Sequence, residues 1–243
     1  MNNAMNFKFA ANVPAIYATE PADNVSKKYT FIPTTKIMED MVDLGYEAVA
    51  ASRKLRGDKY YGWHTVTFKD EVKRSIDFSI LMENSHNAKH SFSFSTSFYV
   101  NGQYFYTDCN HVRIRHMGYD FSTLQEGINE LVMNIPDQIS LIEKMQNTSI
   151  SSEALVAFAT DVLKVRFNRE DLTSDDAELL LKEIGTITNF WSAFERIYWT
   201  IMRGGFQRRS KNGRIRKTTC IKSMQRTIKL SQQMFNLAIK RFN

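Results

Sequence analysis

The residues best suited to chemistry in this chain form a dense basic run near its C-terminal end. Six of the ten residues from 208 to 217 are basic: Arg208, Arg209, Lys211, Arg214, Arg216 and Lys217. Guanidinium groups can grip phosphate oxygens through paired hydrogen bonds, and Asn212 and Gly213 permit a turn that lets the run follow a nucleic-acid backbone. We therefore expect a loop that clamps phosphates. A solvated linker without a ligand is the alternative.

Charge is divided unevenly along the sequence. Twelve Lys and Arg residues and no Asp or Glu lie between Arg203 and Asn243, whereas the rest of the chain holds 20 basic and 26 acidic residues, a net charge of −6. Such segregation causes self-repulsion, which a polyanion relieves while it releases counterions. The pattern predicts nucleic acid as the partner, unless the basic end serves solubility alone.

Further basic residues are candidates for secondary contacts to nucleic acid. They are Lys222 and Arg226 on the predicted last helix, Arg113 and Arg115 on one face of a short predicted strand, and Arg53. Arg53 precedes Tyr60, Tyr61 and Trp63, and aromatic rings beside cations are typical of a surface that binds single strands. The alternatives are core packing for Trp63 and surface ion pairs for the two strand arginines.

No residue set points to catalysis or to a cofactor. His86 and His90 are four residues apart, but the sequence around them is typical of a turn, so no helix presents both on one face. A metal site would need the fold to converge a second set: Asp108, Cys109, His111 and His116. Glycine-rich phosphate loops and nucleophile elbows are missing from the sequence. We predict no enzyme, cofactor or metal, with a metal-dependent nuclease as the alternative.

Composition indicates a folded protein without targeting features. A hydrophobic content of 43% and an aromatic content of 12% argue against disorder. Cys109 and Cys220 match no metal or redox spacing, which favours a reduced intracellular protein. The first eleven residues resemble no signal peptide, and no apolar stretch is long enough to span a membrane. We expect a cytoplasmic protein, in the host cell if a phage encodes it, without membrane contact.

The elements that would position these residues change in character along the chain. Residues 1–30 are polar and are predicted to form an arm. A short helix follows Pro33 and should end at Gly45. Alternating apolar residues then indicate an antiparallel meander, with strands at 63–68, 76–80, 91–98, 104–106 and 111–115 and a hairpin turn at Asn101–Gly102.

From Phe121 onward the apolar spacing is helical. A long stripe over 124–145 contains Pro136, which should kink or split the helix, and further helices begin near Ser151, Thr173 and Phe190. The last helix carries an apolar stripe that we expect to pack against other helices or a neighbouring subunit: Ile221, Met224, Ile228 and Phe235.

These patterns predict an α+β fold. An antiparallel β-sheet with a preceding short helix occupies the first half, and the helical second half ends in a basic amphipathic helix. We expect four segments: an N-terminal arm at 1–30, an antiparallel β-rich core with one helix at 31–118, a helical region packed on that core at 119–205, and the basic loop with the C-terminal helix at 206–243.

Several short motifs in a fixed order resemble a known family. They are Glu83-Asn84-Ser85-His86-Asn87, Ile114-Arg115-His116-Met117-Gly118, Trp191-Ser192-Ala193-Phe194-Glu195 and Ile201-Met202-Arg203-Gly204-Gly205, followed by a basic helix. Together they resemble the phage- and plasmid-borne family called domain of unknown function 932, from Phe31 to Lys240. The resemblance implies a mobile-element setting and transfers no catalytic residue. The family usually has a Cys-Ser-Asn-Gly-like hairpin where this chain has Tyr99-Val100-Asn101-Gly102, so no cysteine role is carried over.

A looser similarity concerns layout alone. A helix, an antiparallel meander and a long helix, in that order, are similar to the core of the single-strand annealing proteins. With the basic end, this predicts a single-stranded DNA-binding protein of a phage or plasmid that promotes strand annealing or recombination as a homo-oligomer. The alternative is a mobile-element interaction protein that inhibits a host defence or replication factor. The acidic remainder of the chain would suit contacts with such a host protein partner.

Overall fold

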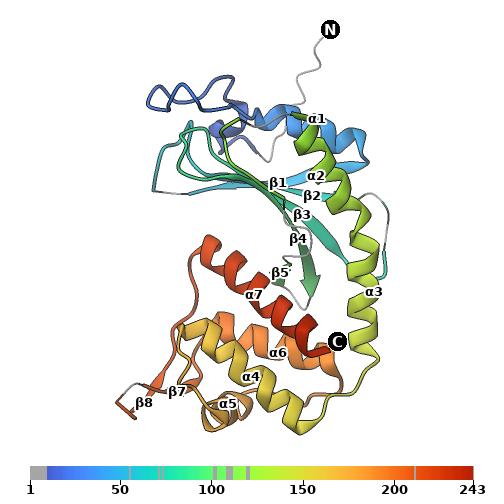
Figure 1. Ribbon diagram of the computed structural model, residues 1–243, viewed down its shortest axis with the longest axis vertical. Helices are drawn as coiled ribbons and strands as arrows, with labels where there is room; N and C mark the ends of the chain where they lie inside the picture. The colour runs from blue at the N-terminus through green and yellow to red at the C-terminus, as the bar shows by residue number, and fades with distance from the viewer. Residues whose placement is uncertain are drawn as a thin grey trace. The chain divides into compact units, whose positions relative to one another are not determined.

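The structure is a computed structural model that describes residues 10–54, 56–70, 72, 74–100, 103–107, 112–118, 121–210 and 212–242. Two compact units make up the chain, and we name them by content. The sheet unit comprises Met1–Tyr99 and Cys109–Ile135, and the helical unit comprises Val100–Asp108 and Pro136–Asn243. The fold is α+β, as predicted: strands dominate the first half and helices the second (Figure 1).

An antiparallel sheet forms the centre of the sheet unit. Its strands are β1 (Tyr46–Arg53), β2 (His64–Asp70), β3 (Phe78–Asn84), β4 (Phe92–Val100) and β6 (Val112–Ile114). The first four pair in sequence order, and β6 pairs with β4. Alternation along β4 places its phenylalanines on one face, where Phe94 contacts Phe68 and Phe98 contacts Phe78. The strands of the predicted meander are therefore confirmed, whereas its hairpin turn at Asn101–Gly102 lies outside the described residues. β1 is a strand that we had not delimited.

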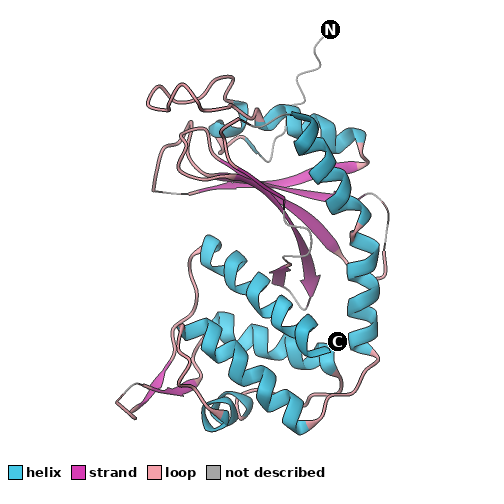
Figure 2. Cartoon of the chain, in the orientation of Figure 1, coloured by secondary structure: helices cyan, strands magenta, loops and turns pink. Residues whose placement is uncertain are grey.

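Two helices cover one face of this sheet (Figure 2). They are α1 (Thr34–Asp43), the helix predicted after Pro33, and α2 (Phe121–Met133). Gly127 lets α2 approach β6 closely, because an added Cβ would stand 3.0 Å from a methyl carbon of Val112. Part of the predicted arm is also ordered: the short 3-10 helix η2 (Pro14–Tyr17) buries Ile16 completely.

The helical unit contains five helices and three short strands among its described residues. The helices are α3 (Ile135–Gln146, in this unit from Pro136), α4 (Ser152–Phe167), α5 (Ser174–Leu181), α6 (Phe190–Arg203) and α7 (Met224–Phe242). The strands are β5 (Gln103–Tyr106), β7 (Gln207–Arg209) and β8 (Ile215–Lys217). Pro136 splits the predicted long helix, since α2 ends three residues before it. Polar caps start the next helices, such as Ser151, whose Oγ accepts from the Ala154 amide.

Aromatic side chains form the core of the helical unit. The Phe105 ring of β5 lies 5.2 Å from Trp191 and 5.5 Å from Phe194, both on α6, and 5.8 Å from Phe235 on α7. Ser231 on α7 also hydrogen bonds to both backbone groups of Tyr106 on β5. These contacts join α6, α7 and β5 into one packed body.

The last helix packs largely as its apolar stripe predicts. Ile228 and Phe235 are buried, and Met224 is half-buried at the first turn of α7. Ile221 is also half-buried, but it precedes the helix. The contacts of Phe235 with Phe105 and Phe194 place this stripe against the helical half of the same chain.

The aromatic core predicts which of two neighbouring substitutions destabilises the protein. Phe105→Ala should lower the free energy of unfolding by about 3–5 kcal/mol, because it opens a cavity between α6 and α7. Tyr104→Ala, on the exposed side of the same strand, should cost much less. Urea unfolding followed by circular dichroism measures both, and equal losses would contradict the proposed role of Phe105.

Candidate nucleic-acid interface

The basic run is a β-ribbon and not the irregular loop predicted. β7 and β8 pair antiparallel, with Arg208 opposite Arg216 and Arg209 opposite Ile215. The turn closes through a hydrogen bond from the Ser210 amide to the Arg214 carbonyl, 2.8 Å long. Gly213 adopts a φ of +75°, which glycine tolerates best. The turn-forming residues Asn212 and Gly213 thus lie between two short strands, and the basic residues lie on the strands of this hairpin as well as in its turn.

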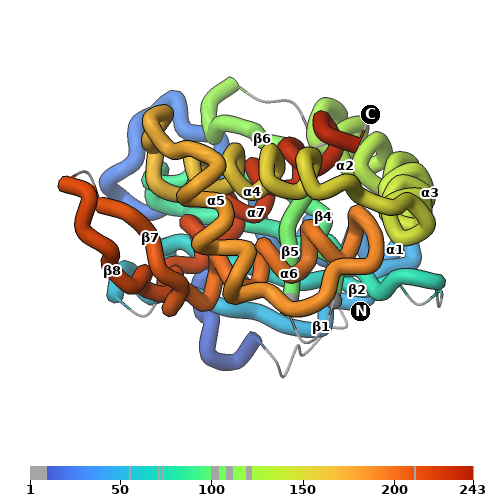
Figure 3. Tube along the Cα trace, turned by 90° about the horizontal axis from the view of Figure 1, so that it is seen from below, coloured from blue at the N-terminus to red at the C-terminus, as the bar shows by residue number. Residues whose placement is uncertain are grey.

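The base of the ribbon is fixed in the helical unit. The Thr218 amide donates to the Phe206 carbonyl at 2.9 Å, and both residues are buried. Gly204 lies against the backbone of Thr219, where a Cβ would stand only 2.5 Å from the Thr219 carbonyl carbon. The ribbon therefore starts from a fixed base, and its β7 strand lies beside α5 (Figures 1 and 3).

Most of the ribbon's cations face solvent. Those exposed are Arg209, Arg214, Arg216 and Lys217, while Lys211 lies outside the described residues. Arg208 differs, because it is half-buried and its guanidinium carbon lies 4.4 Å from the centre of the Phe167 ring. On the same strand, the backbone carbonyl of Arg209 accepts a hydrogen bond from Arg169. The ribbon is held by its backbone and Arg208, which leaves four cationic side chains available for contacts.

These cations form no ion pairs with described residues. Among the Lys and Arg residues between Arg203 and Arg241 that the structure covers, Arg241 alone forms an ion pair, with Asp161. Elsewhere ion pairs recur, as in Arg74–Asp70 and Arg169–Asp171. Folding thus leaves the ribbon's described cations without direct ion pairs.

Two further predicted contacts lie near the start of α7. Lys222 is exposed and precedes the helix, and Arg226 is exposed in its first turn. Arg226 and Arg208 are both close enough to Arg166 on α4 to lower the pKa of its guanidinium, after burial itself. Arg166 was missed in the sequence because a basic residue in the last turn of a helix is ordinary.

The remaining candidates belong to the sheet unit and do not share one patch. Arg53 ends edge strand β1 and donates to the backbone carbonyl of Asn12. Arg113 lies on β6, from which β1 is separated by β2, β3 and β4, and Arg115 directly follows β6. Both strand arginines are exposed and lack an ion pair among the described residues.

The aromatic residues near Arg53 divide between core and surface. Trp63 is buried and donates its indole N–H to Glu83. Its role is therefore core packing, the alternative that we gave for this residue. Tyr60 keeps 58% of its surface exposed, and the Lys59 amino group lies 5.6 Å from its ring centre. Tyr61 is half-buried, so Tyr60 is the most exposed of the three rings and the best suited to stacking.

Two histidines of the sheet unit converge on one threonine. His64 Nδ1 donates to the Gly62 carbonyl, so its Nε2 is left to accept the hydroxyl proton of Thr34 at 2.9 Å. We therefore assign His86 Nε2 and Asn84 Nδ2 as the donors to the same oxygen, at 3.3 and 3.0 Å. This neutral network joins the start of α1 to β2 and to the end of β3.

Burial keeps this network uncharged. It lowers the pKa of His64 to about 4 and that of His86 to about 3, with the nearby His64 ring adding to the second effect. His116 stacks on Tyr29 at 4.8 Å and donates from Nδ1 to the Thr30 carbonyl. Within the described ranges no group of three or more His, Cys, Asp or Glu residues is placed to hold a metal. Asp108, Cys109 and His111 lie outside them, so the alternative of a metal site at those residues is not tested.

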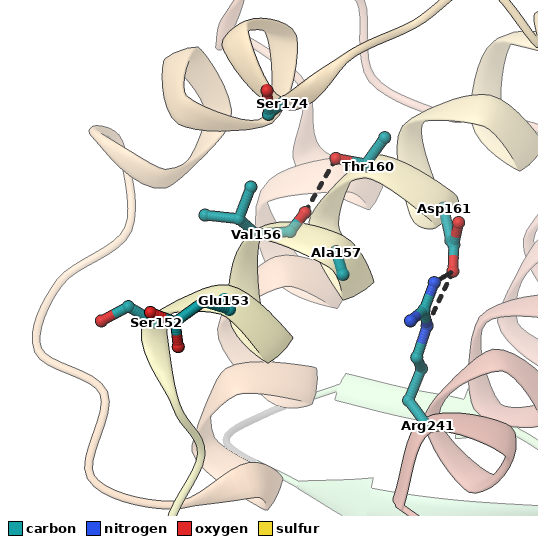
Figure 4. Close-up of a pocket in the computed structure, with 8 residues that line it drawn as sticks. All are labelled: Ser152, Glu153, Val156, Ala157, Thr160, Asp161, Ser174 and Arg241. Atoms are coloured by element: carbon teal, nitrogen blue, oxygen red, sulfur yellow. Dashed lines mark hydrogen bonds and ion pairs between the residues drawn. The ribbon is translucent and has the colours of Figure 1, made fainter.

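A shallow apolar pocket of about 580 Å³ lies along α4 (Figure 4). Its wall includes Val156 and Ala157, and several of its polar side chains are bonded within the protein. Arg241 pairs with Asp161 at 2.6 Å, and the Thr160 hydroxyl donates to the Val156 carbonyl. The one cation that lines this pocket is therefore paired, whereas the exposed cations of the ribbon form no ion pair with a described residue.

Comparison with known proteins places the chain in a family. Residues 21–227 match the family described as Domain of unknown function (DUF932), and the chain belongs to it. It is 22% identical to UPF0380 protein YafZ of Escherichia coli (strain K12) and 21% identical to UPF0380 protein YfjQ of the same organism. Each match covers 93% of this chain and 87% of the relative. No solved structure matches significantly. Among the described helices, none is both long and apolar enough to cross a membrane.

The histidine network predicts a loss of stability in mild acid. Because the folded-state pKa values of His64 and His86 lie below the ordinary value near 6.5, the unfolded chain binds protons first as the pH falls. Stability should be full above pH 6.5 and decrease towards pH 4, by about 2 kcal/mol per ring at pH 5. Urea unfolding at pH 7 and pH 5 measures this loss.

A non-titrating variant serves as its control. His86→Gln keeps an amide donor near Thr34 and should remove about half of the pH dependence contributed by the pair. Equal stability of the wild type at pH 7 and pH 5 would contradict the assignment of neutral, buried rings.

Proposed function

We propose that this member of the DUF932 family binds nucleic acid through the basic surface of its helical unit. The observation that carries the proposal is a set of four exposed cations without acidic partners among the described residues, mounted on a fixed ribbon: Arg209, Arg214, Arg216 and Lys217. Exposed cations in a protein's own ion pairs are largely neutralised, whereas unpaired cations release counterions from a polyphosphate when they bind it.

The ribbon is suited to backbone contacts. Antiparallel pairing holds its cations along two adjacent strands, and the fixed base limits the entropy lost when they meet a ligand. Contacts of this kind position a strand and carry no sequence information. The proposed binding is therefore non-specific in sequence and strongly dependent on salt.

The preferred ligand is the finer part of the proposal. We propose single-stranded DNA, whose annealing the protein promotes as a homo-oligomer. Tyr60, which stays exposed beside Lys59, offers a ring on which any base can stack. A two-stranded β-ribbon also fits the major groove of duplex DNA, so both ligands belong in the test.

Removing the four ribbon charges should weaken binding to all sequences alike. Changing Arg209, Arg214, Arg216 and Lys217 to Gln should flatten the dependence of log K on log salt by about 0.7 per lost contact on a single strand, or about 3 in all. Folding should be unaffected, since these side chains are exposed. Fluorescence anisotropy with single- and double-stranded oligonucleotides at several salt concentrations measures the slope.

The matched control removes equal charge elsewhere. Gln at Lys27, Lys28, Lys89 and Lys144, all exposed and outside the ribbon, should leave the slope nearly unchanged. Equal slopes in the ribbon variant and the wild type would overturn the proposal. A wild type that binds no oligonucleotide would favour the other candidate, a protein that inhibits a host factor.

A further inference from the structure

A cleft of about 510 Å³ lies within the helical unit, between the C-terminal end of α4 and the first half of α7. Helix α4 contributes Val165, Arg166 and Phe167, followed by Asn168; α7 contributes Arg226, Lys229, Leu230 and Gln233. The α7 residues are spaced three, four and seven positions from Arg226, so they share one face of the helix. Two of them are basic, and they face the end of α4 that carries Arg166.

Arg166 is a buried cation without a counter-charge. Only 7% of its surface is exposed, yet it forms no ion pair with any described residue. One hydrogen bond is formed, from Nη2 to the Thr219 carbonyl at 3.1 Å, and the buried Nε–H has no partner there. A guanidinium has five N–H donors, and leaving a buried charge unpaired costs several kcal/mol. This cost is what a bound anion would offset.

The neighbours of Arg166 increase the positive charge. Its guanidinium carbon lies 5.3 Å from the Phe167 ring, whose centre is 4.4 Å from that of Arg208. Two guanidinium groups therefore contact one phenylalanine ring. Arg166, Arg226 and Lys229 line the cleft, and Arg208 lies outside its lining but near enough to act electrostatically on Arg166. None of these four cations has a carboxylate partner in the described part of the chain.

The dipole of α4 does not account for this cluster. A helix C-terminus carries about half a negative charge and stabilises a cation by about 0.3–1 kcal/mol. This dipole is enough to favour one basic residue in the last turn of α4. The last turn already contains two, Lys164 and Arg166. Arg208, Arg226 and Lys229 come from other elements and add charge that the dipole cannot balance.

We propose that this cleft is a phosphate-binding site. Arg166 supplies the buried donors at its floor, and Arg226 and Lys229 supply the charges at its rim. The donors come from two helices, which suits a tetrahedral phosphate better than a planar carboxylate. The source of the phosphate rests on the proposed function: Arg208 belongs to both the ribbon and this cluster, so a strand on the ribbon would present its phosphates here.

Inorganic phosphate tests the cleft without any oligonucleotide. Phosphate should raise the melting temperature of the wild type above that in chloride of equal ionic strength, because binding stabilises the folded state. Arg226→Gln with Lys229→Gln should abolish the rise. The control, Lys182→Gln with Lys240→Gln, removes two exposed charges of the same unit outside the cleft and should retain it.

Either of two results would overturn the site: no specific phosphate response in the wild type, or the same response in the rim variant. Arg166 is tested separately, in case its replacement disturbs α4. Arg166→Met should lose the phosphate response and be at least as stable as the wild type in chloride, since it removes an unpaired buried charge. A phosphate response that survives in this variant also overturns the assignment.

Oligonucleotides then identify the source. If the cleft binds a terminal phosphate, the wild type should bind a 5′-hydroxyl strand about tenfold more weakly than the 5′-phosphorylated one, and the rim variant should bind both equally. If it binds an internal phosphate, the rim variant should lose about tenfold for both strands. A phosphate response without any oligonucleotide binding would refute the proposed function and leave the cleft standing. Oligonucleotide binding without a phosphate response would refute the phosphate site in the cleft and leave the proposed function standing.

Discussion

The aromatic packing around Phe105 is the constraint on which the architecture of the helical unit depends. Its ring contacts Trp191 and Phe194 on α6 and Phe235 on α7, so one side chain of a short strand ties two helices together. Once α6 and α7 are held in this way, the chain between them must leave the core and return to it. That segment contains the ribbon, and its buried base at Phe206 and Thr218 follows from the same packing.

Apolar burial also explains how the fold tolerates so much unbalanced charge. Repulsion among the cations between Arg203 and Arg241 opposes folding, and in the described residues one ion pair, Arg241–Asp161, relieves it. The helices stay in place because α6 and α7 bury large side chains, each of which contributes about 1.5–3 kcal/mol. Stability and charge therefore have separate sources in this unit, which leaves the cations free to serve a ligand.

In the sheet unit, by contrast, two ionisable residues are buried and uncharged. His64 and His86 are kept neutral by burial and share the hydroxyl of Thr34, and Asn84 completes the same network. A protonated ring there would lose an acceptor and gain a charge without a partner. Two of the family-like motifs, around His86 and His116, are thus polar parts of the core in this structure. Their hydrogen bonds connect the chain before α1 to the ends of β3 and β6.

The sequence by itself determined the α+β class, the position of α1, the strict alternation of β4, the break at Pro136 and the burial of Ile228 and Phe235. These features follow from local periodicity and from residues such as proline, whose effects reach only a few positions along the chain. It also revealed the charge segregation and the basic run. Only the tertiary structure decided that the run pairs as a ribbon, that His64 and His86 meet at Thr34, and that Arg166 is buried near Arg208 and Arg226. Each of these depends on contacts between segments far apart in sequence, whose partners local patterns do not specify.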